Sequence, residues 1–351
     1  MPGRDFCAIM KKYKLFMRGQ KTLEDIARGS AIVAKILAAD KDLANWAEHF
    51  QRVDKIYALG CGSSYWLAFL VAAFFRRAGR DATAVPASEF FLTGYPVPRR
   101  TLALVFSQSG ETTETVRAAA QAREQGAAVF AVINRGAGAL AKMADGFFLT
   151  PAGSEQILAT KSFAAGLAAA YLFAHYLTGA RPDDLSGLPV LYEKILALDI
   201  KPLVRCLAPA VRAYSLGIGL DYGLAGEAAL KLGEGAGLQI TALPALEISH
   251  GYKANLDGVP VLVVGLQTAY HKVYENLIRE IRQAGARIIS FSPLNLPLAA
   301  DCNVEIPGPG DTAIFTAVKL LQRLAVETAL ARGLDPDQPA GLAKTVRRVN
   351  F

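Results

Sequence analysis

Hydroxyl and amide side chains gather in one short segment, Ser107-Gln108-Ser109-Gly110-Glu111-Thr112. The segment follows an apolar run that predicts a strand and precedes a helical pattern. Neutral hydroxyls, backbone N–H groups and a helix N-terminus can together hold a phosphate monoester without a lysine or arginine. The alternative is ordinary capping of a helix whose first turn carries Glu111 and Glu114. Because capping needs only one hydroxyl, we favour the phosphate interpretation.

A second loop of this kind, Gly60-Cys61-Gly62-Ser63-Ser64, follows the first predicted strand. Its glycines allow a tight turn, and its serines stand near the start of a predicted helix, where free N–H groups favour an anion. The glycine pair is only part of a dinucleotide fingerprint, because Tyr65 occupies the third glycine position, and no GxxxxGK[ST] motif is present. We therefore expect no cofactor.

The elements that position these loops come in two sets. Five apolar, β-branched-rich runs lie between residues 55 and 151, and five more lie between 213 and 308, offset by 156–158 residues. This near-constant offset predicts a duplicated domain. Strands that alternate with helices predict an α/β fold of two tandem αβα sandwich domains with parallel sheets, whose ligands sit beyond the carboxyl ends of the strands. The predicted helices are Ser63–Arg77, Thr112–Gln125, Lys161–Thr178, Gly223–Gly235, Ala269–Gln283 and Thr312–Arg332.

Four parts follow from this pattern. An N-terminal helical arm spans residues 1–52, the first domain 53–182, the second domain 195–332, and a C-terminal tail 333–351. Gly, Pro and Asp cluster near Gly179–Pro189, where we place the linker. The tail is too rich in proline and glycine to add to a sheet, and we expect it to dock across the site.

The two loops resemble the sugar isomerase (SIS) domain, through CGSS after the first predicted strand and SQSGET after the third. Two such domains in tandem are similar to the isomerase half of glucosamine-6-phosphate synthase and to its deaminase and deglycase relatives. The resemblance covers residues ~20–351 in order. Further matching segments are Ala87–Phe90, Gly153–Glu155, Ala159–Phe163, Glu227–Glu234, Asp335–Pro339 and Leu342–Val346.

The resemblance implies a sugar-phosphate substrate and the residues that bind it. The loop 153–160 is one residue shorter than in the synthase, which leaves its mapping open. The implied phosphate ligands are Ser64, Ser107, Gln108, Ser109 and Thr112, and the residues lining the sugar are Ser63, Ala159, Ala343 and those near Ile157.

The resemblance also implies four catalytic residues. Glu234 matches the base that moves a proton between C1 and C2, and Lys344 matches the tail lysine that contacts, or forms an imine with, the sugar carbonyl. Lys231 matches a second active-site lysine, and His250 the ring-opening histidine, which the neighbouring subunit of a dimer supplies. Isomerisation needs such a carboxylate, and positive charge beside the developing enediolate. Lys231 and Glu234 share a helix face. The alternative for them, a solvated ion pair, fits the apolar Gly/Ala-rich surroundings poorly.

Departures from the synthase leave the reaction open. Tyr252, Gly233 and Ala340-Gly341 stand where the synthase has a proline, a lysine and an Arg-Asn pair. No glutaminase domain precedes residue 20, so we expect no glutamine-dependent amino transfer. The expected activity is that of an isomerase/deaminase converting glucosamine 6-phosphate to fructose 6-phosphate and ammonia. The alternatives are a fructosamine-6-phosphate deglycase, an isomerase without amine chemistry, and a non-catalytic sugar-phosphate sensor.

Composition narrows the function classes. The 351 residues are 52% apolar and 20% charged, which excludes a disordered chain. The net charge of +7 suits a small anionic substrate. The sequence lacks the run of basic residues interleaved with aromatic ones that is typical of proteins binding single-stranded nucleic acid. The four cysteines lack CxxC spacing and the four histidines are scattered, so we expect free thiols and no metal site.

The two longest apolar runs, Ser63–Phe75 and Phe163–Ala180, raise the question of a membrane span. We expect both to be buried helices, because the first is too short and the second contains His175 and several small residues. The N-terminus has no signal-peptide pattern. These features favour a cytoplasmic enzyme that contacts neither membrane nor nucleic acid and works as a homodimer with shared active sites.

Overall fold

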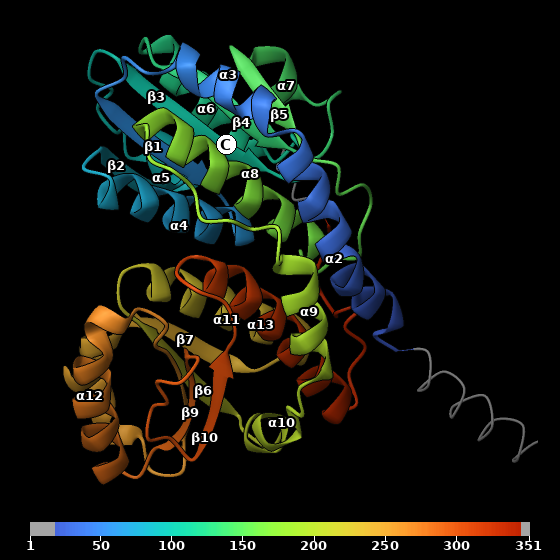
Figure 1. Cartoon of the computed structure of the whole chain (residues 1–351), viewed down its shortest axis with the longest axis vertical. Helices are drawn as coiled ribbons and strands as arrows, with labels where there is room; N and C mark the ends of the chain where they lie inside the picture. Colours follow the sequence, from blue (N-terminus) through green and yellow to red (C-terminus); the bar gives the residue numbers. More distant parts are fainter. Residues whose placement is uncertain (1–17, 345–351) are drawn as a thin grey trace, which may run out of the picture.

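Two five-stranded parallel sheets, one above the other in Figure 1, form the framework of the chain. The computed structural model describes residues 18–344, so parts of the predicted arm and tail lie outside the described residues. The first sheet has the order β2-β1-β3-β4-β5 and the second the matching order β7-β6-β8-β9-β10, which confirms the predicted duplication. The strands are β1 (Lys55–Gly60), β2 (Asp81–Pro86), β3 (Thr101–Ser107), β4 (Ala128–Ile133), β5 (Gly146–Leu149), β6 (Arg212–Gly217), β7 (Gln239–Pro244), β8 (Pro260–Val264), β9 (Arg287–Pro293) and β10 (Cys302–Ile306).

The central strands are apolar because helices cover both of their faces. Every residue of β3 and β8 is buried, as in parallel sheets generally. Leu59 of β1 pairs in register with Val105 of β3, so the two strands end side by side. The loops that begin at Cys61 and Gln108 therefore emerge at the same edge of the sheet.

The helices follow the predicted pattern closely in the first repeat and less closely elsewhere. α4 and α8 have the predicted bounds, and α8 is buried along nearly its whole length. α11 begins three residues earlier than predicted, directly after Gly219, and the predicted helix Ala269–Gln283 is divided between the short 3₁₀ turn η3 and α12. The helices are α2 (Gln20–Ala38), α3 (Asp40–His49), α4 (Ser63–Arg77), α5 (Ala87–Leu92), α6 (Thr113–Glu124), α7 (Ala139–Met143), α8 (Lys161–Thr178), α9 (Leu188–Ala197), α10 (Lys201–Leu207), α11 (Leu220–Ala236), α12 (His271–Gln283) and α13 (Thr312–Ala331), with 3₁₀ turns η1 (Ala245–Ser249), η2 (Tyr252–Asn255) and η3 (Thr268–Tyr270).

Within residues 18–344, no helix has both the length and the apolar character needed to cross a bilayer. The long apolar run in α8 instead packs against α2, α3 and α4. Its composition therefore reflects burial inside the protein.

The two repeats meet where α4 packs against α11 (Figure 1). Gly226 of α11 lies against the ring of Trp66, and a Cβ at this glycine would come within 2.3 Å of the ring. A Cβ at Gly223 would come within 2.7 Å of Leu70. Close approach of the helices therefore depends on glycine at both positions.

The tail fastens the beginning of α2. Asp337 accepts hydrogen bonds from the backbone N–H of Thr22 (2.8 Å) and from its hydroxyl (2.6 Å), and Asp335 accepts from the N–H of Gly19 (3.2 Å). The first N–H groups of a helix lack intrahelical partners and favour negative charge. The carboxylates thus join the two ends of the described chain.

Equivalent loops in the two repeats share one backbone shape but carry different side chains. Gly62 has φ 56° and ψ −127°, and Gly219 has φ 59° and ψ −120°. Two residues after each glycine, the first repeat has Ser64 and the second has Asp221. The Asp221 carboxylate is fully buried and accepts from the N–H of Gln267 (3.1 Å) and the hydroxyl of Tyr274 (2.9 Å). The second repeat therefore places its own carboxyl group where the first presents a serine.

Asp221 should make the stability of the protein depend on pH. Burial raises the pKa of its carboxyl group to about 7, although the two hydrogen bonds oppose this. Between pH 4 and 7 only the folded chain then holds the proton, so the free energy of unfolding falls as pH rises through this window and levels off above it. The difference from the ordinary value of 3.8 corresponds to roughly 4 kcal/mol. Asp221→Asn should gain stability over the wild type as pH rises, measured by urea unfolding from pH 4.5 to 8.

The matched control is Asp257→Asn, because Asp257 is an exposed carboxylate in the same repeat. Its profile should follow the wild type. Identical pH profiles for the wild type and Asp221→Asn would mean that Asp221 is ionised in the folded chain.

Candidate active site

A cavity of about 250 Å³ opens at the carboxyl ends of β1 and β3, between the loops of the first repeat, helix α11 and the tail. Eleven of the twelve predicted site residues line it. They are Ser63, Ser64, Ser107, Gln108, Ser109, Thr112, Ala159, Lys231, Glu234, Ala343 and Lys344.

The loop after β3 is folded by its own serines. The hydroxyl of Ser107 accepts from the N–H of Gly110 (3.1 Å), and that of Ser109 accepts from the N–H of Glu111 (3.2 Å). Gly110 has φ 67°, a conformation that favours glycine. These bonds use oxygen lone pairs, so both hydroxyl hydrogens stay available as donors toward an anion.

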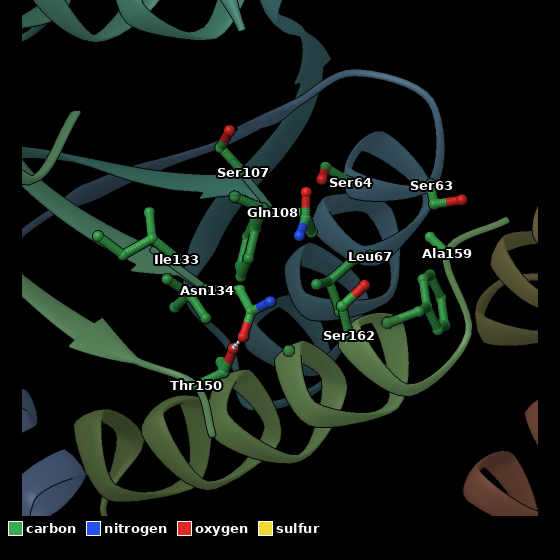
Figure 2. Close-up of a pocket in the computed structure, with 14 residues that line it drawn as sticks. Ser63, Ser64, Leu67, Ser107, Gln108, Ile133, Asn134, Thr150, Ala159 and Ser162 are labelled. Atoms are coloured by element: carbon green, nitrogen blue, oxygen red, sulfur yellow. Dashed lines mark hydrogen bonds between the residues drawn. The ribbon is translucent and has the colours of Figure 1, made fainter. Parts of the chain in front are cut away.

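Figure 2 shows the recess beside this loop, where Ser64 at the start of α4 faces the end of β3 and Gln108. The buried Nε2 of Gln108 has no hydrogen-bond partner among residues 18–344. A buried donor without a partner is costly, and a bound acceptor would relieve that cost. Below Gln108 in this view, the Thr150 hydroxyl donates to the side-chain oxygen of Asn134 (3.1 Å). The side-chain NH2 of Asn134 in turn donates to the carbonyl of Gly153 (2.6 Å).

Three ionisable residues of α11 lie together at the cavity, and two of them, Lys231 and Glu227, are buried. The Lys231 ammonium lies 2.5 Å from Glu234 and 3.7 Å from Glu227, and its side chain is 1% exposed. The hydroxyl of Ser63, from the other repeat, donates to Glu227 (3.1 Å). Lys231 and Glu234 are thus no solvated surface pair.

The cluster sets the protonation of its members. Burial raises the pKa of Glu227 to about 8, with Lys231 acting against this and Glu234 adding to it. Burial alone would lower the pKa of Lys231, but the two carboxylates outweigh it and the pKa is raised. Lys231 therefore stays charged, and burial favours the protonated form of Glu227. Sequence reasoning did not single out Glu227, although its spacing of four from Lys231 and seven from Glu234 puts all three on one helix face.

The tail lysine is held by a second buried carboxylate. Lys344 donates to Glu155 (2.8 Å) and to the carbonyl of Ile157 (3.4 Å). The Glu155 side chain is fully buried and also accepts from the N–H groups of Thr160 (3.2 Å) and Ser162 (3.1 Å). Sequence reasoning missed Glu155 as well, because nothing in the spacing connects residues 155 and 344.

His250 lies apart from the cavity of its own chain. It is exposed at the end of η1, beside η2. Leu246 and Tyr252 flank it and are 52% and 42% exposed, which is high for large apolar side chains. The predicted role of His250 thus requires a second chain.

No cluster of His, Cys, Asp and Glu within the described part of the chain is arranged to hold a metal ion. Cys61, Cys206 and Cys302 are free thiols, while Cys7 lies outside the described residues. Cys61 lines the cavity, and burial raises the pKa of its thiol. A protonated thiol is a poor nucleophile, which suits a lining role.

The arrangement combines two chemical capacities in one cavity. Neutral donors from the first repeat can hold an anion, and a carboxylate with two ammonium groups can move a proton and stabilise developing negative charge.

Comparison with known proteins places this geometry in a family. The SIS domain model matches residues 49–176 and 206–332. The glutamine–fructose-6-phosphate aminotransferase of Gloeobacter violaceus is 35% identical over 322 residues, covering 85% of this chain and 52% of the relative. The chain thus spans about half the length of the curated relatives it matches.

Solved structures agree. The C-terminal domain of glucosamine-fructose-6-phosphate aminotransferase from Francisella tularensis superposes with a TM-score of 0.84 at 24% identity, covering 91% of this chain and 98% of that one. Glucosamine-6-phosphate deaminase from Thermotoga maritima gives a TM-score of 0.75 at 25% identity, covering 93% and 99%. With two matches to one domain model on two equivalent sheets, the chain belongs to the SIS domain family, as a tandem pair homologous to the isomerase half of glutamine–fructose-6-phosphate aminotransferase.

Proposed function

We propose that the protein is an amino-sugar-phosphate isomerase/deaminase that converts glucosamine 6-phosphate and water to fructose 6-phosphate and ammonia. The proposal rests on two features that share one cavity. One is the Lys231–Glu234 pair, and the other is a set of neutral donors that we call the hydroxyl cradle: Ser64, Ser107, Gln108, Ser109 and Thr112. The deaminase from Thermotoga maritima, which this chain nearly matches in length, supports the choice among sugar-phosphate reactions.

We assign the phosphate to the loops after β1 and β3. Ser64, Ser107, Ser109 and Thr112 offer hydroxyl donors, and Gln108 offers its unpartnered amide. Thr112 also precedes α6, whose first N–H groups favour negative charge. A dianion held this way needs no lysine, which leaves both cavity lysines for the sugar.

Glu234 is assigned as the base. It removes the C2 proton of the open-chain aldose and returns a proton to C1, so the enolamine becomes a ketimine that water splits into ketose and ammonia. Lys231 fixes the carboxylate through their ion pair. Lys344 is assigned to the sugar carbonyl, where it can supply positive charge or, after losing a proton, form an imine. Glu227 lies beside Lys231, and because burial raises the pKa of its carboxyl group, it offers a further proton donor.

Ring opening is assigned to His250 of a second copy, in a homodimer. The exposed apolar residues beside His250 suit burial against another chain. Because each cavity then depends on two chains, a monomer would lack ring-opening activity.

One observation favours the deglycase alternative. A larger hollow of about 890 Å³ shares Glu234 and Leu342 with the cavity and carries the aromatic side chains of Trp66 and Tyr222. Gly233 lines this hollow without a side chain, and the only described atom within 4 Å of a Cβ added there would be the carbonyl oxygen of Leu238, at 3.7 Å. Such a hollow can hold an apolar substituent on the substrate nitrogen.

The decisive experiment is a substrate panel. The purified protein should release ammonia and fructose 6-phosphate from glucosamine 6-phosphate, and should bind unphosphorylated glucosamine far more weakly, because the cradle is built for a phosphate. Coupled assays for ammonia and ketose phosphate measure both. Release of amines only from fructosamine 6-phosphates would select the deglycase, and tight binding without turnover would select a sensor.

Mixed dimers test the division of labour between chains. Glu234→Gln keeps the side-chain shape but removes the base, so turnover should fall by about 10²–10⁴-fold while hexitol 6-phosphate still binds. His250→Ala should be inactive as a homodimer. After subunit exchange, each mixed dimer should regain one intact site and part of the activity. No recovery in verified mixed dimers would place His250 outside the neighbour's site.

Borohydride trapping tests whether Lys344 forms a covalent imine with the sugar or only supplies positive charge. The Glu155 carboxylate can accept the proton that the ammonium must lose before its nitrogen attacks a carbonyl. We expect borohydride to trap fructose 6-phosphate on Lys344 as a reduced adduct, located by peptide mass spectrometry, and Lys344→Arg to abolish the adduct. An active Lys344→Arg enzyme and no wild-type adduct would show that the lysine supplies charge alone.

A further inference from the structure

A buried ion pair, outside the cavity, joins the N-terminal helix α2 to Lys161, the first residue of α8. Asp25 of α2 lies 2.6 Å from Lys161, and their side chains are 8% and 5% exposed. The same carboxylate accepts the backbone N–H of Gln156 at 3.0 Å. These contacts fasten α2 to the connection between β5 and α8.

Such a pair contributes little to stability by itself. Desolvation of two charges offsets much of their attraction, and well-packed apolar residues often serve as well or better. A buried ion pair of this kind can instead fix how the segments around it are placed. Here these segments are helix α2, the start of α8 and the connection that precedes α8.

The connection between β5 and α8 has no regular structure where it contacts Asp25. Gln156, whose N–H Asp25 holds, stands between the two residues that contact the tail lysine. Glu155 accepts from Lys344 at 2.8 Å and the carbonyl of Ile157 at 3.4 Å. A shift at Gln156 would therefore move both contacts of Lys344.

The N-terminal end of α2 also binds the tail, which carries Lys344. One turn before Asp25, Thr22 binds Asp337 of the tail through its N–H and its hydroxyl. Helix α2 thus forms hydrogen bonds both to the tail that carries Lys344 and to the loop that binds the Lys344 ammonium.

We propose that Asp25 is a positioning residue for Lys344. Through Gln156 it fixes Glu155 and Ile157, and these direct the Lys344 ammonium into the cavity. The positional claim stands on the contacts alone, whereas its effect on turnover rests on the function proposed for Lys344.

The test compares two double variants that leave no lone buried charge. Asp25→Asn with Lys161→Met keeps an acceptor for Gln156, and Asp25→Leu with Lys161→Met removes it at similar volume. With leucine, kcat should fall by about 10²-fold, as for a displacement of roughly 1 Å, while KM changes less than about threefold. The asparagine variant should keep most of the activity. Amide exchange at residues 153–160 and 334–344 should accelerate only in the leucine variant.

Equal kcat and equal exchange in the two variants would overturn the proposal. If the leucine variant does not fold, Asp25→Ser with Lys161→Met replaces it, because the shorter side chain cannot reach Gln156. Failure of both to fold, beside a folded asparagine variant, would show that the contact supports the whole domain and would also overturn it. If the wild type turns over no sugar phosphate, the proposed function fails, and the exchange measurement still decides the positional claim.

Discussion

The close contact between α4 and α11 is the constraint on which the rest of the site depends. Gly226 lets α11 approach the ring of Trp66 and Gly223 lets it approach Leu70, because a Cβ at either position would come within 3 Å of these side chains. α4 begins with the serines of the first repeat, and α11 carries the buried charges of the second. The hydrogen bond from Ser63 to Glu227 crosses between the repeats at this point. The packing of these two helices therefore brings the hydroxyl cradle close to Lys231 and Glu234.

The turn after the first strand recurs in both repeats, but its side chains differ. Both repeats keep the strand-to-helix turn with a glycine at positive φ. In the first, the turn opens to the cavity. In the second, Asp221 fills the equivalent place, bonded to Gln267 and Tyr274. An internal carboxyl group thus occupies the place where the first repeat presents a serine, and α11 contributes Lys231 and Glu234 to the cavity of the first repeat.

Buried carboxylates outside the reacting groups organise the tail. Asp337 holds it to α2, and Glu155 receives its lysine. A tail without regular structure has no hydrogen-bond ladder to fix its path, so side-chain contacts must do so. Three segments far apart in sequence, namely α2, the connection before α8 and the tail, consequently form one unit around Lys344.

The sequence by itself determined the fold class, the duplication and most of the lining of the candidate site. Strand and helix periodicity are local properties, and the carboxyl ends of parallel strands share an edge, so the loops at Ser64 and Ser107 were predictable as neighbours. The resemblance added Lys231, Glu234 and Lys344. Only the tertiary structure decided that Glu227 and Glu155 are buried partners of these lysines, and that Asp25 holds the loop between them. Burial and long-range pairing depend on how distant segments pack, and the spacing of residues along one chain does not contain that information.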